Sequence, residues 1–443
     1  MNSDIRKLLL IACSFMSTLG VVAQNTVQDP LTFTFQGNTI QNYTIPVSGW
    51  YKLDARGGQG GPAINHVGGR GASMSCFYYF TAGEQLRIAV ARAGQPGENS
   101  SNNTPSGGGG GGSSSIVKVD GSNLTPILIA GGGGGAGSGN DGLQGVTENN
   151  GSNGNCTIAN CSSAGGVNGG GGSVTSDENG GAGGAGYIGD GSTKYVQISQ
   201  QTIVAYGGQC YLSGNYGGSH PNSIGGDGGW GGGGEGGNAN AKTSSNIGGS
   251  GGGGGGYSGG GGGSNGGGGG GGGSYINPAA ITETLAQYPG SNTGDGTILI
   301  KLINSSTENK TYTAAGNSGS YIWPVNGRIY TTSGTYYYVD ANGVLHILNL
   351  TIKKGLVSGF VAPGGSLMAF PNPSNGLLTL RTPSLEVAAK LEIYAVDGRR
   401  VQEYDVPART TRFQVDLRRH GAGVYVLRML AEGEDEYIKV IVE

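Results

Sequence analysis

The chain has 443 residues, of which 97 are glycine, and only 12% of the residues carry a formal charge. The net charge at neutral pH is -3, and residues 57–296, which hold most of the glycine, contain six lysines and arginines against twelve aspartates and glutamates. This charge balance repels phosphate backbones and argues against nucleic-acid binding. Because glycine has no side chain to bury and loses the most entropy on ordering, we expect no ordinary helix or hydrophobic core in the glycine runs themselves.

Residues 1–23 are typical of a secretory signal peptide. Arg6 and Lys7 precede an apolar stretch over residues 8–22, which ends in small residues. A lipoprotein signal is the alternative, because the residues before Cys13 resemble a lipobox. No later segment approaches the ~20 apolar residues that a membrane-spanning helix needs. We therefore expect an exported protein without a transmembrane span.

Residues 24–303 are expected to form one glycine-rich β domain. Apolar and polar residues alternate between Leu31 and Arg56, which predicts antiparallel strands with one buried face. After residue 57, glycine runs alternate with short apolar islands, which flexible linkers lack. We therefore expect the runs to pack as extended threefold helices that exchange backbone hydrogen bonds. The main runs are 107–112, 131–135, 169–172, 231–234, 251–256, 259–263 and 266–273.

Two smaller β modules are predicted to follow. Residues 305–362 are rich in tyrosine, and their alternation and glycine turns predict a small β module followed by a linker. Residues 366–443 have an ordinary composition that predicts a compact antiparallel β-sandwich. Its strands are expected near residues 376–381, 390–394, 401–406, 412–417, 423–430 and 437–442. The predicted fold is thus mostly β throughout.

Four cysteines remain after the signal peptide, and an even number in an exported chain favours disulfides. Cys156 and Cys161 are close enough in sequence to close one loop, which leaves Cys76 and Cys210 as a long-range pair. The other two pairings stay open. A zinc site is disfavoured, because there is no C-x-x-C pair and the four histidines are scattered.

The last predicted sandwich carries three motifs, FPNPSNGLLTL from Phe370, IYAVDGRRV from Ile393 and LRRHGAGVYVLRM from Leu417. In these motifs it resembles the type A sorting domain of the type IX secretion system of Bacteroidetes. The matching positions are Pro371, Asn372, Pro373, Gly376, Gly398, Gly423, Val424 and Tyr425. The resemblance implies that a translocon and a sortase act on this domain. It also implies release of the protein or its attachment to lipopolysaccharide on the cell surface.

A second resemblance covers the glycine-rich region. NYTIPVSGWYKLDARGGQGG from Asn42, GGDGGWGGGGEGG from Gly225 and GDGTILIKLI from Gly294 follow one another as in the extracellular glycine-rich domain of the anaplastic lymphoma kinase and leukocyte tyrosine kinase receptors. This resemblance implies packed polyglycine helices beside a tumour-necrosis-factor-like β-sandwich. The receptors' kinase and membrane span are absent, so only the fold and a capacity for protein recognition carry over.

No residue pattern indicates catalysis or a cofactor. The sequence G-x-G-x-x-G at Gly184, Gly186 and Gly189 is explained by composition, because a phosphate cradle needs a strand before it and a helix after it. His66 and His220 lie in loops without a nucleophile context. The acidic residues that could bind calcium match no calcium-loop spacing and are better explained as solvated turn carboxylates; they are Asp190, Asp227, Glu235 and Asp295. We expect no cofactor, no metal ion and no enzymatic activity.

The candidate binding residues are aromatic residues that stand beside glycine: Tyr211, Tyr216, Trp230, Tyr257 and Tyr275. Such rings can contact a protein or a glycan, or can cap the glycine bundle, and the sequence does not separate these roles. Our hypothesis is a non-catalytic secreted or cell-surface recognition or adhesion protein with an unidentified ligand. The alternatives are a structural surface or matrix element and an extracellular hydrolase, which is disfavoured because acid, base and nucleophile are not clustered.

Overall fold

The computed structural model describes residues 30–100, 103–158, 161–198, 201–221, 223–239, 248–283, 285–314, 320–354, 367–382, 387–431 and 434–443. The predicted signal peptide, Cys13 and most of the predicted linker lie outside these ranges. Throughout the described ranges the regular elements are β-strands and short 3-10 turns, with no α-helix, so the prediction of a mostly β chain is confirmed. The chain divides into two compact units, one of residues 1–307 and 337–347 and one of residues 308–336 and 348–443.

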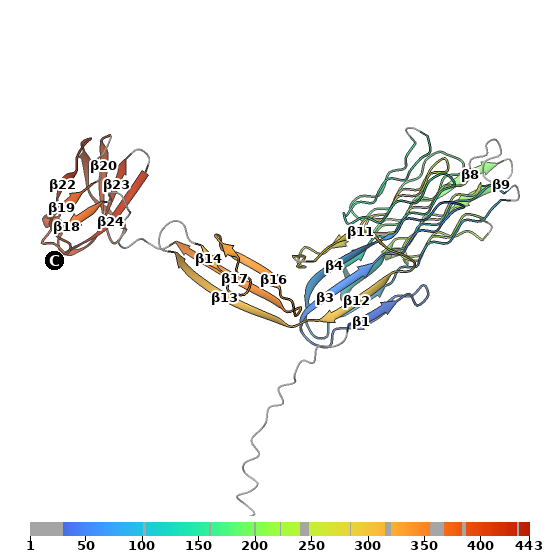
Figure 1. The fold of residues 1–443 in the computed structure, drawn as a ribbon, viewed down its shortest axis with the longest axis horizontal. Coiled ribbons are helices and arrows are strands. Elements are labelled where there is room, and N and C mark those ends of the chain that lie inside the picture. Colours follow the sequence, from blue (N-terminus) through green and yellow to red (C-terminus); the bar gives the residue numbers. More distant parts are fainter. Residues whose placement is uncertain are drawn as a thin grey trace, which may run out of the picture. The chain divides into compact units, whose positions relative to one another are not determined.

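Two five-stranded antiparallel sheets form the sandwich of the first unit, and Figure 1 labels the strands of the first sheet. The first sheet has the order β1 (Leu31–Thr34), β12 (Thr297–Leu302), β3 (Gly49–Arg56), β4 (Gly71–Phe80) and β11 (Tyr288–Asn292). The second has the order β10 (Tyr275–Ile276), β7 (Asn123–Ala130), β6 (Ser114–Asp120), β5 (Gln85–Ala89) and β2 (Gln41–Thr44).

The core of this sandwich follows from alternation along each strand. On β3 the buried residues are Tyr51, Leu53 and Ala55, and they pack against inward residues of the second sheet such as Ile88 and Ile116. The alternation seen in the sequence between residues 31 and 56 therefore marks real strands with one buried face. On the strands of the second sheet, the residues next to these inward ones face outward, and they form the floor of the candidate site described below.

The glycine runs form neither helix nor strand in the backbone assignment, yet hydrogen bonds join them throughout. Run 251–256 shows the pattern, because its amide partners change with a period of three residues. The amides of Gly251 and Gly254 donate to the carbonyls of Gly267 and Gly270, respectively. Those of Gly252 and Gly255 donate to Gly108 and Gly111, and those of Gly253 and Gly256 donate to Ala182 and Ala185. All six N···O distances are 2.8–3.1 Å.

The carbonyls of the same run accept hydrogen bonds in three further directions. The donors are amides of Gly132, Gly135, Gly234, Gly260 and Gly263. Run 251–256 therefore has six neighbouring segments, namely 107–112, 131–136, 181–186, 231–236, 259–264 and 266–273. Backbone hydrogen bonding takes the place of a hydrophobic core here, as the sequence predicted. The glycine-rich segments extend past the two sheets toward the hairpin of β8 (Lys194–Ile198) and β9 (Gln201–Ala205) (Figure 1).

The runs approach one another so closely that a side chain cannot enter. A Cβ atom on Gly253 would lie 2.7 Å from the amide nitrogen of Gly184 and 2.7 Å from the carbonyl carbon of Gly260, and it would be closer still to the Gly260 oxygen. Non-bonded carbon contacts are optimal at about 3.5–4.0 Å, so any other residue would force the runs apart. The glycine content is thus a packing requirement.

Only one of the two predicted disulfides is present. Cys156 and Cys161 are bonded, whereas Cys76 and Cys210 are unpaired thiols and both are buried. The predicted Cys76–Cys210 bridge is therefore wrong. Cys76 lies on β4 and packs in the sandwich core with Leu53, whereas Cys210 precedes the short 3-10 helix η1 (Tyr211–Ser213), where its Sγ is 3.2 Å from the Ser213 hydroxyl.

The small β module contains a three-stranded sheet of order β13 (Ser305–Ala314), β17 (Leu345–Lys354) and β16 (Gly334–Val339). The hairpin of β14 (Tyr321–Ile322) and β15 (Ile329–Tyr330) accompanies it. Within the first unit, Leu345 and Ile347 pack against Phe77 and Ile281. Within the second unit, Glu308 accepts hydrogen bonds from the Tyr321 hydroxyl and the buried Trp323 indole.

The C-terminal residues form a second antiparallel sandwich. One sheet has the order β18 (Met368–Phe370), β19 (Leu377–Arg381) and β22 (Arg412–Asp416). The other has the order β21 (Arg400–Val406), β20 (Ala389–Ala395), β23 (Gly423–Ala431) and β24 (Glu434–Val442), and η3 (Arg418–His420) follows β22. Leu391, Ile393, Leu427 and Val440 are among the residues of its core. Each of the six strands predicted for residues 366–443 overlaps one of these strands.

Candidate functional site

Four tyrosines stack in a row on the outward face of the second sheet of the first unit. The ring centroids of Tyr275, Tyr257, Tyr187 and Tyr211 are successively 4.5, 6.5 and 5.2 Å apart, with interplanar angles of 21°, 19° and 21°. Tyr275 belongs to β10, and the other three come from the glycine-rich segments and η1. The outward residues of the sheet form the floor of this cluster, together with the Trp230 indole; these residues are Ala89, Val117 and Ile129.

The row unites three of the five aromatic residues proposed from the sequence, Tyr211, Tyr257 and Tyr275, and Trp230 joins the same cluster. Tyr216 instead packs beside Gly214 and is 47% exposed. The sequence reasoning missed Tyr187. Its signal is position, because Tyr187 follows the glycine-rich segment 180–186 in the way that Tyr257 follows run 251–256.

Burial and one cation set the electrostatics of the row. Tyr187 and Tyr211 are 7% and 6% exposed, whereas Tyr257 and Tyr275 are half-buried. Burial raises the pKa of Tyr187 to about 12 and also raises the pKa of Tyr211, and the positive charge of Arg87 opposes both shifts. The phenol groups of Tyr187 and Tyr211 therefore stay neutral at physiological pH. Because the rings stack on one another, most of their faces are already covered.

The two loop histidines have local structural contacts. His66 Nδ1 lies 3.1 Å from a carboxylate oxygen of Asp141, and the His220 ring stacks on Tyr206 with centroids 5.6 Å apart. Gly184 of the G-x-G-x-x-G sequence donates its amide to Gly260 inside the bundle. No α-helix follows this sequence in the described part of the chain.

Two of the acidic residues considered as calcium ligands accept hydrogen bonds from different backbone amides. Asp190 accepts the Cys210 amide and Asp295 accepts the Ala93 amide, both at 2.7 Å. Among the residues that the structure describes, no group of three or more histidine, cysteine, aspartate or glutamate side chains could hold a metal ion.

Glu235 is not the solvated turn carboxylate that the sequence indicated. Its side chain is completely buried in the glycine bundle, where Oε2 accepts the Tyr206 amide at 2.8 Å. Burial raises the pKa of this carboxyl to about 7, hydrogen bonds from Ser223 and Tyr206 act in the opposite direction, and the charge of Asp227 adds to the rise. The expectation failed because the bundle encloses a residue that the glycine-rich sequence suggested was in an open turn.

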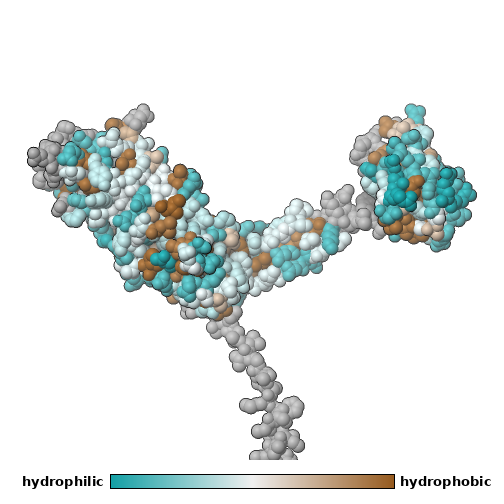
Figure 2. All heavy atoms as spheres, turned by 180° about the vertical axis from the view of Figure 1, so that it is seen from behind, coloured by the Kyte–Doolittle hydropathy of each residue, from teal (hydrophilic) through white to brown (hydrophobic). Residues whose placement is uncertain are grey.

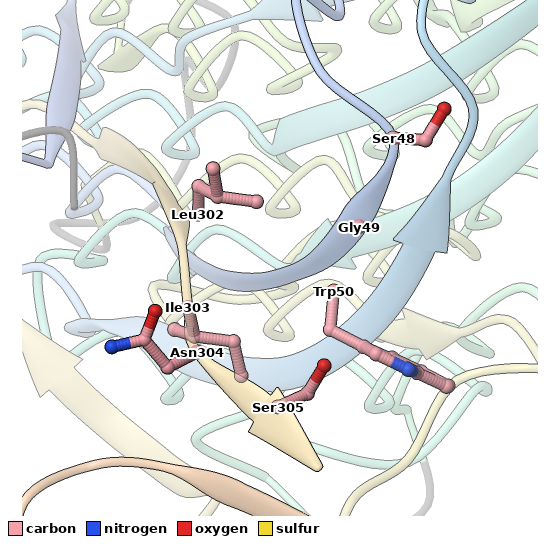
Figure 3. Close-up of a pocket in the computed structure, with 7 residues that line it drawn as sticks. All are labelled: Ser48, Gly49, Trp50, Leu302, Ile303, Asn304 and Ser305. Atoms are coloured by element: carbon pink, nitrogen blue, oxygen red, sulfur yellow. The ribbon is translucent and has the colours of Figure 1, made fainter. Parts of the chain in front are cut away.

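A surface depression of about 370 Å³ lies elsewhere on the first unit (Figure 3). Its lining residues are Ser48, Gly49, Trp50, Leu302, Ile303, Asn304 and Ser305. None of these side chains is an acid or a base, and the Ser48 hydroxyl accepts the Ala82 amide. The depression therefore lacks the proton-transfer groups of an active site.

The motif residues of the C-terminal sandwich tie its first turn to its last strand. Asn372 donates to the Lys439 carbonyl and accepts the Ile441 amide, both at 2.8 Å. The Tyr425 hydroxyl reaches the carbonyls of His420 and Gly421 at 2.7 and 2.9 Å. These bonds give Asn372 and Tyr425 structural roles in the sandwich.

Residues 368–443 match the family described as secretion system C-terminal sorting domain. The C-terminal sandwich is a type IX sorting domain. Its presence indicates export of the protein to the cell surface or beyond it. In the described ranges no helix is both long and apolar enough to span a bilayer.

Comparisons beyond the sorting domain are remote, and no curated protein matches the chain. One similar structure is Ruminococcus gnavus β-glucuronidase in complex with uronic isofagomine, with 14% identity over 37% of this chain and 26% of that chain and a TM-score of 0.13. Another is dimeric latent PorU from Porphyromonas gingivalis, with 12% identity over 90% of this chain and 30% of that chain and a TM-score of 0.15. The chain thus spans less than a third of either protein, and neither similarity bears on its fold or activity.

Proposed function

We propose that this is a non-catalytic recognition or adhesion protein, displayed or released by the type IX system, whose glycine-rich unit is a rigid binding module. The observation that carries the proposal is run 251–256 with its six hydrogen-bonded neighbours. A backbone network of this density holds residues at the ends of the runs in fixed positions, and fixed positions reduce the entropy cost of binding.

We further propose that the runs are polyglycine helices of the threefold extended type. The period of three in their hydrogen-bond partners supports this, since such helices have three residues per turn. The resemblance of residues 24–303 to the receptor glycine-rich domain implies such helices as well. The translocon and a sortase are the proposed partners of the sorting domain, with lipopolysaccharide as a proposed attachment point.

A structural surface or matrix element is the second candidate, and one observation favours it. Tyr187, Tyr211 and Trp230 are nearly inaccessible, so part of the aromatic cluster caps the bundle and does not present a surface. In this alternative the rigid unit spaces other molecules or associates with further copies of itself.

Binding to cells separates the two candidates. Fluorescently labelled full-length chain is titrated onto host and bacterial cells, with unlabelled chain as competitor, and its self-association is measured by light scattering over the same concentrations. Saturable binding that unlabelled chain displaces, with a monomeric protein, supports recognition. Concentration-dependent assembly without saturable cell binding would overturn recognition and support the matrix role.

A further inference from the structure

The depression at the end of the first sheet exists because two neighbouring segments part there. Leu302 is the last residue of β12 that is paired with β3, and the Ile303 amide still donates to the Trp50 carbonyl at 3.0 Å. Beyond this bond the chain leaves β3, and the Asn304 carbonyl accepts the Leu345 amide at 2.9 Å. The depression of about 370 Å³ is lined by residues of both parted segments, and all of them belong to the first unit.

An aromatic pair stands at this depression. Trp50 lines it and lies opposite Tyr79 of β4, with the ring centroids 5.6 Å apart and the ring planes at 73°. Tyr79 is 49% exposed, whereas Trp50 is half-buried because it also packs against the cluster around Phe77. Figure 2 shows hydrophobic residues exposed in patches among hydrophilic ones on the glycine-rich unit, so exposed rings alone do not mark a site. The concave surface beside this pair sets it apart.

Polar groups at the depression are free to bind a ligand. In the described part of the chain, the Trp50 indole Nε1, the Asn304 amide and the Ser305 hydroxyl make no hydrogen bond, and the indole nitrogen is not buried. The Ser48 hydroxyl accepts the Ala82 amide at 2.8 Å, which leaves its own proton to donate. In Figure 3 the Ser305 hydroxyl points toward the Trp50 indole, and the Asn304 amide points away from it. Because these residues line a surface depression, a ligand can reach them without a change in the fold.

The chemistry of the lining favours an uncharged ligand. None of the lining side chains carries a charge, and further along β3 Lys52 and Asp54 neutralise each other at 3.2 Å. Indole, hydroxyl and amide groups together offer a flat apolar surface with hydrogen-bond donors and acceptors at its edge. A sugar ring has the matching features, because its C–H groups form an apolar face and its hydroxyl groups both donate and accept hydrogen bonds.

We propose that this depression binds one neutral sugar unit of a glycan, which packs on Trp50 and Tyr79 and exchanges hydrogen bonds with the Ser305 hydroxyl and the Trp50 Nε1–H. The volume of the depression lies in the range of small-molecule sites, about 300–1,000 Å³, whereas a stable protein interface buries about 800 Å² on each partner. The depression therefore suits a glycan better than the face of a protein. The inference rests on the proposed recognition function and names a ligand class for it, at a place outside the tyrosine row.

The indole N–H signals of the full-length protein in NMR spectra report binding directly. The chain has three tryptophans, and Trp230 and Trp323 are 2% and 1% exposed, so their signals serve as internal controls for that of Trp50. The probes are titrated to about 10 mM; they are neutral hexasaccharides of β-1,4-glucose, β-1,3-glucose, α-1,4-glucose and β-1,4-mannose, and the anionic hexasaccharide of α-1,4-galacturonate. We expect at least one neutral probe to shift the Trp50 signal saturably. The galacturonate should bind at least about tenfold more weakly, because its carboxylates would lose water without gaining a cationic partner.

Matched variants, followed by calorimetry, assign the binding to these residues. Trp50→Ala should weaken binding of the best neutral probe by at least about tenfold, and Ser305→Ala by a few fold, because the first removes the ring and the second a single hydrogen bond. Trp50 also packs inside the unit, so Trp50→Phe is included; it keeps a ring, loses the Nε1–H and should weaken binding by a few fold. The Trp230 and Trp323 signals show whether each variant is folded.

The control is Tyr288→Ala, since Tyr288 is 57% exposed on β11 and does not line the depression. It should bind the probe as the unmodified protein does. Unchanged affinity in the double variant of Trp50→Phe and Ser305→Ala would overturn the proposal.

The probes also decide on the ligand class. Saturation by none of the neutral probes up to about 10 mM overturns the proposal, and equal affinity for the galacturonate overturns the choice of a neutral ligand. The cell-binding titration is repeated with the double variant. Cell binding that persists unchanged in it refutes the depression as the recognition site and leaves the proposed function standing, whereas absent cell binding by the unmodified protein refutes the proposed function itself.

Discussion

Substituting Gly254 by alanine tests whether the glycine bundle is the structural core of the first unit. Gly254 lies in the run with six neighbours and has an ordinary backbone conformation. A Cβ there would lie 2.9 Å from the carbonyl carbon of Gly132 and 2.9 Å from the oxygen of Gly133, and it would be nearer still to the Gly132 oxygen. The neighbouring run 131–136 must therefore move away by about 1 Å to restore normal contact.

The cost follows from the bonds that hold this neighbouring run. Gly132 and Gly135 donate to the carbonyls of Gly255 and Gly252, both at 2.8 Å. Leaving a buried backbone group without its partner costs about 1–3 kcal/mol, so losing these two bonds lowers the free energy of unfolding by about 2–6 kcal/mol. That is a large fraction of the roughly 5–15 kcal/mol that stabilises a typical domain.

Hydrogen exchange read by mass spectrometry measures this locally, which avoids assuming one transition for a chain of several units. Peptides covering residues 248–273 should exchange at least tenfold faster in Gly254→Ala. Gly180→Ala is the control, because the nearest atom to its Cβ is the Asp177 oxygen at 3.3 Å, so stability should change by less than about 1 kcal/mol. Unchanged protection in Gly254→Ala would falsify the view that close backbone packing stabilises the unit.

Three further outcomes are expected. Glu235→Gln should raise the free energy of unfolding at pH 8 by about 3 kcal/mol. The reason is that a carboxyl whose pKa rises from 4.5 to about 7 on folding destabilises the fold progressively as the pH climbs from 4.5 to 7. Equal slopes of unfolding free energy against pH in the two proteins would contradict this. Cys76 and Cys210 should react with iodoacetamide only after denaturation without reductant, as mass spectrometry can show, and a failure to react then would mean that they are bonded. Deleting residues 368–443 should retain the protein in the periplasm in cell fractionation, and normal export of the deletion variant would remove the role assigned to the sorting domain.

The parts predicted correctly from the sequence are those in which side chains carry the signal. Alternation between Leu31 and Arg56 predicted strands with one buried face, as β3 has, and the motif around Asn372 indicated the sorting domain. Glycine runs beside apolar islands indicated a hydrogen-bonded bundle. In each case the residue type and its spacing reflect one local structural requirement.

The arrangement of the runs could not be predicted, because glycine runs are chemically identical. Nothing in the sequence says that run 251–256 lies beside 107–112 and 181–186, since any of the runs could occupy those places. The unpaired state of Cys210, the burial of Glu235 and the inclusion of Tyr187 in the row all depend on this arrangement. Those three features are the ones that the sequence reasoning missed or mistook.

A bundle without side chains cannot recognise a partner by itself, so recognition depends on the residues that the bundle holds in place. Tyr257 directly follows run 251–256, its amide donates to Gly273, and its carbonyl accepts the Tyr187 amide, both at 2.8 Å. Two members of the row are therefore fixed by the same backbone network that Gly254→Ala disturbs. If the residues held at the ends of the runs form the recognition surface, this variant should also weaken the saturable binding to cells although it alters none of those residues, whereas Gly180→Ala should not. Retained affinity in a loosened bundle would separate the rigidity of the glycine runs from the function of the surface.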